Sequence, residues 1–155
     1  MNLSRALKMK NRLVSRLNDL NRLIAENNVI IKGNKRVFDI DSLGKSREEV
    51  LDNLVKIKVL IDEANGPIRE KIYMMSEFKA QVVFLRSLPT QEGRVKTRLM
   101  SDDSNMEYEA HLSASQIDER IRNTNNRIDE LQDEIDLHNA STNIDFEIDE
   151  RILYS

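Results

Sequence analysis

The sequence predicts a mainly α-helical protein, an elongated antiparallel helical bundle or coiled coil with one or two short β-hairpins. Two observations indicate this fold class. The 155 residues include only four Gly and two Pro, too few for the many turns of an all-β sandwich. Apolar residues recur at helical spacings of three and four along most of the chain. We expect one helical domain over residues 1–142 and an acidic and apolar tail over residues 143–155.

Composition excludes several classes of protein. The absence of cysteine excludes disulfides, thiolate zinc sites and cysteine nucleophiles. The 24 basic and 27 acidic residues give a net charge of -3, so no overall field favours nucleic acid or an anionic membrane. No apolar run approaches the ~20 residues that span a bilayer, and the first residues lack the apolar core of a signal peptide. We therefore expect a cytoplasmic protein with no membrane partner and no extended nucleic-acid surface.

The first helix is expected from about Asn2 to Glu26, with basic residues mostly away from its apolar face. That face comprises Leu3, Ala6, Leu7, Leu13, Val14, Leu17, Leu20 and Ile24. Residues 29–40 then contain two short β-prone runs around Gly33-Asn34, a two-residue turn with glycine first. This pattern favours a β-hairpin near residues 29–40, and an irregular loop is the alternative.

The second helix is predicted to start at a capping box, in which Ser46 and Glu49 satisfy each other's backbone N–H groups. Its apolar face comprises Val50, Leu54, Ile57, Ile61 and Ala64. Asn65-Gly66-Pro67 then interrupts the helix, as a kink or as a reversal.

The third helix, from Pro67 to about Leu88, has an apolar belt too broad for one neighbouring helix to cover. It should lie in the middle of the bundle or form the interface of a homo-oligomer. The predicted interface residues are Ile72, Met75, Phe78, Val82 and Leu85.

A second hairpin is predicted near residues 94–112, with alternating basic and apolar residues followed by alternating acidic ones. Its basic residues suggest a pocket at a subunit boundary for a small anionic, nucleotide-like ligand, if both hairpins lie at one end of the bundle. The candidate ligand-binding residues are Arg94, Lys96, Arg98, Arg86, Lys35 and Arg36. The alternative is surface charge that keeps β-strand edges from pairing.

The last long helix, from Ser113 to about Asn139, carries the most regular seam, at alternating spacings of three and four. The seam residues are Ile117, Ile121, Thr124, Ile128, Leu131, Ile135 and His138. Polar Thr124 and His138 are expected to set register or oligomeric state. In the tail, Ile144, Phe146 and Ile148 alternate with carboxylates, so it could add a strand to its own or another subunit, or fray.

The sequence contains no phosphate-binding glycine loop, HExxH or GxSxG motif, and only two histidines. We therefore expect no catalytic residues, no metal site and no cofactor, and a protein that is not an enzyme. His111 and His138 are interpreted as structural or surface residues.

Three stretches carry a family likeness: Leu3-Ser-Arg-Ala-Leu7, Ala64-Asn-Gly-Pro-Ile68, and Ile128 to Asp136 followed by Asn139-Ala-Ser-Thr142. In these stretches the chain resembles the septicolysin-like family of small helical proteins of bacteria and phages. The resemblance implies a helical bundle and carries over no site residue.

Four functions remain open from the sequence. A non-enzymatic, homo-oligomeric helical binding protein leads, because of the apolar belt and the regular seam. A phage-type counter-defence protein that sequesters a nucleotide-like ligand is the second. A prefoldin-like chaperone is the third and requires apolar helix tips open to solvent. An enzyme is the weakest.

Overall fold

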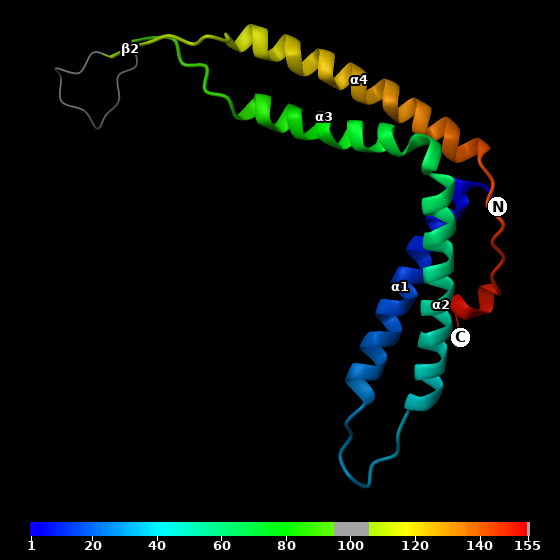
Figure 1. Ribbon diagram of the computed structural model, residues 1–155. Coiled ribbons are helices and arrows are strands. Elements are labelled where there is room, and N and C mark those ends of the chain that lie inside the picture. The colour runs from blue at the N-terminus through cyan, green and yellow to red at the C-terminus, as the bar shows by residue number, and fades with distance from the viewer. Residues whose placement is uncertain (95–105, 155) are drawn as a thin grey trace. The chain divides into compact units, whose positions relative to one another are not determined.

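The computed structural model describes residues 1–94 and 106–154 (Figure 1). These residues form four α-helices and one two-stranded antiparallel sheet, so the predicted mainly α-helical fold class is confirmed. The chain divides into two compact units. Unit 1 comprises Met1–Arg69 and Asp136–Ser155, and unit 2 comprises Glu70–Ile135.

Unit 1 is built on two antiparallel helices, α1 (Leu3–Asn27) and α2 (Ile40–Ala64), which lie side by side (Figure 1). Their apolar faces were predicted correctly in the main, although Met9 is buried and Val14 is exposed. The C-terminal segment completes the core. The buried cluster consists of Leu3, Ala6, Met9, Leu13, Leu20, Val50, Leu54, Ile57, Ile61, Ile144, Phe146 and Leu153.

The C-terminal tail is ordered against its own chain. Asn2 and Asn143 form an antiparallel bridge, in which the Leu3 N–H donates to the Thr142 carbonyl at 2.8 Å. Beyond it Ile144 and Phe146 are buried, whereas the carboxylates between and after them face solvent. A short 3-10 helix, η2 (Glu150–Leu153), then places Leu153 in the core. The sequence left open whether the tail packs on its own subunit, packs on another subunit or frays. In the structure it packs on its own unit.

The predicted start of α2 at Ser46 is wrong. Asp39 caps the helix instead, because one of its carboxylate oxygens accepts from the Asp41 N–H at 3.1 Å and the other from the Ser42 hydroxyl at 2.8 Å. An aspartate at this position satisfies the first free N–H groups of a helix. Ser46 therefore lies inside α2.

The predicted hairpin near residues 29–40 is also wrong, since the structure contains no strand there. The β-prone runs form an irregular loop with one turn, in which the Asn34 N–H donates to the Ile31 carbonyl at 3.0 Å. Gly33 makes this turn possible with φ +95. Two isolated short strands without a third strand or a covering layer are marginal in water, so the two β-prone runs do not pair with each other.

Unit 2 contains α3 (Arg69–Ser87) and α4 (Ala114–Ser141) up to Ile135. A short 3-10 turn, η1 (Gly66–Ile68), follows α2 and precedes α3. Lys71 near the start of α3 forms an ion pair with Glu134 near the end of α4, so the two helices run antiparallel (Figure 1).

The seam of α4 is confirmed, because each of its seven predicted residues is buried or half-buried. Thr124 is the buried polar member, and its hydroxyl donates to the Arg120 carbonyl at 2.8 Å. The buried hydroxyl thus has a hydrogen-bond partner within its own helix, which replaces the water that burial removes. At the start of α4, the Ser113 hydroxyl accepts from the Gln116 N–H and the Gln116 side chain accepts from the Ser113 N–H, a reciprocal cap.

The second predicted hairpin is present as a short antiparallel pair, β1 (Gly93–Arg94) and β2 (Glu107–Tyr108). Arg94 is paired with Glu107, which places opposite charges across the two strands as the sequence suggested. The predicted basic residues Lys96 and Arg98 lie outside the described residues.

Candidate functional site

The loop that joins α1 to α2 at one end of this helix pair, residues 28–39, is the first candidate site and is called the tip loop (Figure 1). Val29, Ile31 and Val37 expose 81%, 76% and 85% of their surface. Aliphatic side chains this open, gathered in one loop, are typical of an interaction site. Residues 28–38 contain no carboxylate and three basic residues, Lys32, Lys35 and Arg36.

The shape of the tip loop is held by Arg36. Its guanidinium donates to the Asn27 carbonyl at 2.7 Å and to the Asn28 carbonyl at 3.2 Å, both at the end of α1. These two bonds commit two of the five N–H donors of the guanidinium to the loop itself. Arg36 therefore orders the loop, while Lys32 and Lys35 remain exposed.

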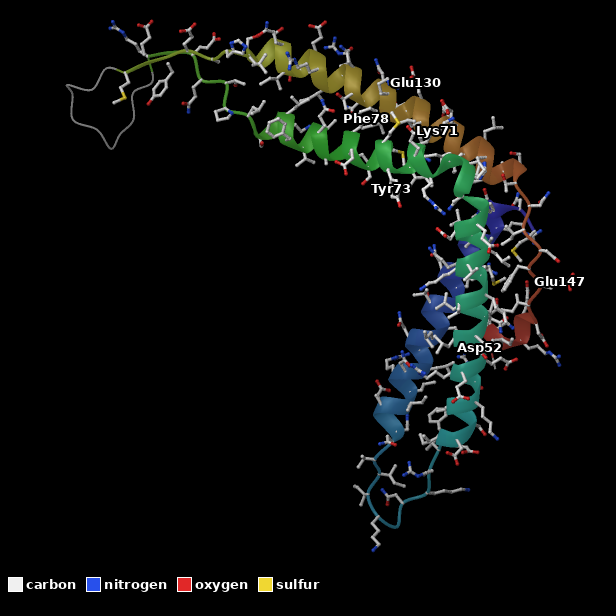
Figure 2. The ribbon with its side chains drawn as sticks, viewed as in Figure 1. Asp52, Lys71, Tyr73, Phe78, Glu130 and Glu147 are labelled. Carbon is white, nitrogen blue, oxygen red and sulfur yellow. The ribbon has the colours of Figure 1, made fainter. Side chains whose placement is uncertain are left out.

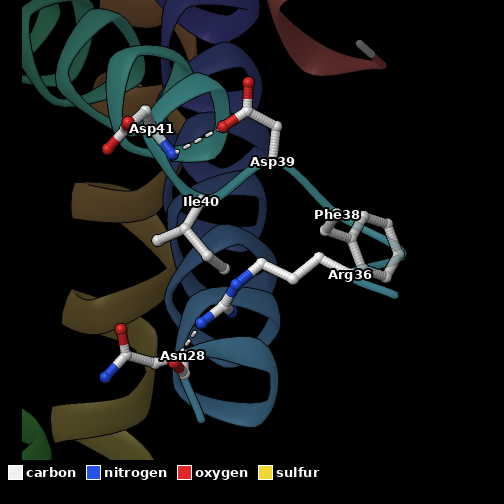
Figure 3. Close-up of a pocket in the computed structure, with 6 residues that line it drawn as sticks. All are labelled: Asn28, Arg36, Phe38, Asp39, Ile40 and Asp41. Carbon is white, nitrogen blue, oxygen red and sulfur yellow. Dashed lines mark hydrogen bonds between the residues drawn. The ribbon is translucent and has the colours of Figure 1, made fainter. Parts of the chain in front are cut away.

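A hollow of about 490 Å³ opens beside the tip loop (Figure 3). Phe38 and Ile40 form its apolar wall. Its polar wall is formed by Asn28, Arg36, Asp39 and Asp41. The hydrogen bond from the Ser42 side chain, followed by backbone N–H donors of Ser42 and Asp41, holds the pKa of Asp39 below its usual range. The carboxylates of Asp39 and Asp41 therefore offset the positive charge of Arg36 in this hollow.

The second candidate is the side of α3 that faces away from α4. Figure 2 shows Phe78 and Lys71 directed toward α4 and Tyr73 directed away from it. Tyr73, Val83 and Phe84 expose 65%, 68% and 59% of their surface. Because Val83 and Phe84 follow Tyr73 by about three turns, the three side chains share one side of the helix, here called the outer face of α3.

The predicted interface residues lie elsewhere on α3. Val82 and Leu85 are buried, and Ile72, Met75 and Phe78 are half-buried. Within unit 2, α4 is the helix that covers them, as the direction of Phe78 indicates (Figure 2). A subunit interface through these five residues stays a prediction.

The predicted ligand-binding residues are divided between the two units. Lys35 and Arg36 belong to the tip loop of unit 1, whereas Arg86 and Arg94 belong to α3 and β1 of unit 2. Arg36 is occupied by backbone carbonyls, and Arg94 lies across from Glu107. An anion pocket built from the whole predicted set stays a prediction.

The described residues offer little of the usual catalytic chemistry. They contain no group of three or more His, Asp or Glu side chains arranged to hold a metal ion. The His138 ring donates through Nε2 to the Ala64 carbonyl at 2.9 Å and so ties the end of α4 to the end of α2. This bond supports the structural interpretation of His138. None of the helices in the described part of the chain is long and apolar enough to cross a membrane.

Comparisons with protein-family models, curated proteins and solved structures find no match to this chain. The resemblance to the septicolysin-like family therefore stays a prediction.

Sequence reasoning missed both surfaces named above. The β-prone residues of the tip loop predict two paired strands, in which part of the side chains would be covered. The structure leaves these residues unpaired and exposed. On α3, the breadth of the apolar belt was the signal, but a pattern of apolar residues does not say which side a neighbour covers.

Proposed function

We propose that the chain is a non-enzymatic helical binding protein that works as a homo-oligomer. The observation that carries this proposal is the outer face of α3, where Tyr73, Val83 and Phe84 remain open to solvent. α4 covers the opposite side of α3 within unit 2, so the outer face has no partner among the described residues of that unit.

The three exposed side chains of the outer face supply part of the area that a subunit contact needs. The three side chains offer roughly 300 Å² of apolar surface per subunit, or about 600 Å² in a dimer. This area is below the roughly 1,200 Å² that a specific interface buries in total. The outer face would therefore form the apolar centre of a contact to which neighbouring residues add area.

The test replaces Tyr73→Lys and Phe84→Lys together and compares sedimentation equilibrium with the unmodified chain. The expected result is association at least about a hundredfold weaker, because two ammonium groups would have to be desolvated in the contact. Circular dichroism should show unchanged helix content, since both side chains point into solvent.

The matched control is Val55→Lys with Val59→Lys, two valines of α2 that expose 54% and 51% of their surface. This control should leave association unchanged. Equal weakening by the control pair, or unchanged association of the α3 variant, would contradict the proposed interface.

A prefoldin-like chaperone is the second candidate, and one observation favours it. That function requires apolar helix tips open to solvent, and the tip loop carries Val29, Ile31 and Val37 at one end of the α1–α2 pair. Sequestration of a nucleotide-like ligand has weaker support, because Arg36 is engaged by the Asn27 and Asn28 carbonyls.

A further inference from the structure

We propose that the tip loop is a docking site for an acidic, apolar segment of a partner protein. This inference does not depend on self-association through α3, because the tip loop lies in unit 1 and the outer face of α3 lies in unit 2.

The apolar part of the argument rests on three side chains. Val29, Ile31 and Val37 are each more than three-quarters exposed, although the loop that carries them has a defined shape. Most aliphatic residues of unit 1 are instead buried or half-buried between α1, α2 and the C-terminal segment. Aliphatic side chains held outward in an ordered loop are pre-organised for a partner, which lowers the entropic cost of binding.

Charge complementarity specifies an acidic partner. The tip loop carries three basic side chains, Lys32, Lys35 and Arg36, and one carboxylate, Asp39 at its base, in a chain whose net charge is -3. Lys32 and Lys35 flank the Gly33-Asn34 turn and are exposed, so each can pair with a carboxylate of a partner. A local positive field of this kind steers acidic partners and rejects basic ones.

The hollow surface of the site favours a polypeptide over a lipid surface as the partner. The hollow beside the loop, lined in part by Phe38 and Ile40, can receive a side chain (Figure 3). A bilayer is flat and would leave it empty.

The backbone also suits an extended segment. Val29 and Ile31 are more exposed than Ile30 between them, which is the alternation of a strand, yet residues 29–32 pair with no strand in the described chain. An extended peptide that lies along residues 29–31 could place its alternate side chains against the aliphatic and basic groups of the loop.

The test uses two fluorescent peptides of about twelve residues, one alternating Val and Glu and the other alternating Val and Lys, with the full chain titrated in fluorescence anisotropy. The Val–Glu peptide should bind about tenfold or more tightly than the Val–Lys peptide. Exchanging Lys32→Glu and Lys35→Glu should reverse this preference. Replacing Val29→Ser, Ile31→Ser and Val37→Ser should weaken binding of the Val–Glu peptide by about tenfold or more.

Two control variants separate the tip loop from general effects. Lys56→Glu with Lys58→Glu, on the exposed surface of α2, should leave binding within about twofold. The Tyr73→Lys and Phe84→Lys variant should bind the Val–Glu peptide as the unmodified chain does, so that failure of the oligomer proposal and failure of this one are distinguishable.

Three outcomes would overturn the inference. Equal binding of the two peptides would indicate chaperone-like capture of any apolar chain. Binding to vesicles of phosphatidylserine and phosphatidylcholine without binding of the Val–Glu peptide would assign the loop to a membrane surface. Binding of neither probe would leave the loop without this function.

Discussion

Replacing Phe146 by alanine is expected to lower the free energy of unfolding of unit 1 by about 3–5 kcal/mol. Phe146 is buried in the cluster formed with α1 and α2, and it lies beyond the backbone bridge between Asn143 and Asn2. Removal of the ring leaves a cavity between elements that are far apart in sequence. Thermal or urea unfolding followed by circular dichroism measures the change.

The matched control for Phe146 is the next residue, Glu147, whose side chain is exposed. Glu147→Ala should change the free energy of unfolding by no more than about 0.5 kcal/mol. Equal stability of the Phe146 variant and the unmodified chain would contradict the packing of the tail on its own unit.

Replacing Leu131 by alanine is expected to lower the free energy of unfolding of unit 2 by about 2–5 kcal/mol. This destabilisation should be confined to unit 2. Leu131 is buried in the seam of α4, and unit 2 has only the α3–α4 seam and a two-stranded sheet to stabilise it among its described residues. Hydrogen exchange measured by mass spectrometry should therefore show faster exchange of backbone amides in α3, with protection in α1 unchanged.

The control for Leu131 is Leu137→Ala on the same helix, where the leucine exposes 71% of its surface. This variant should leave exchange in α3 as it is. Faster exchange in α1 as well as in α3 after the Leu131 change would show that the two units unfold together and would contradict the separate cores.

The helices could be predicted because their signal is local. The seam of α4 and the apolar face of α2 follow directly from residue spacing, and the structure buries them as predicted. Helix ends were less predictable. The Ser46–Glu49 pattern fits a capping box, but α2 begins after Asp39, because a residue type that can cap a helix does not fix where the first turn starts.

The candidate sites depended on information that a single sequence does not contain. The β-prone residues around Gly33 look the same whether or not another strand is near enough to pair with them. Likewise, the apolar belt of α3 includes both Phe78, which faces α4, and Tyr73, which does not (Figure 2). Exposure is a property of the arrangement of helices, so neither surface could be assigned from residue types alone.

Native mass spectrometry of the unmodified chain, purified from its own host cells, tests the central claim most directly, because it counts subunits and detects a retained small ligand together. The proposed homo-oligomer predicts a discrete mass that is an integer multiple of the 18.0 kDa chain, with no added small-molecule mass. A mass of 18.0 kDa alone at concentrations well above the micromolar range would contradict self-association through the outer face of α3.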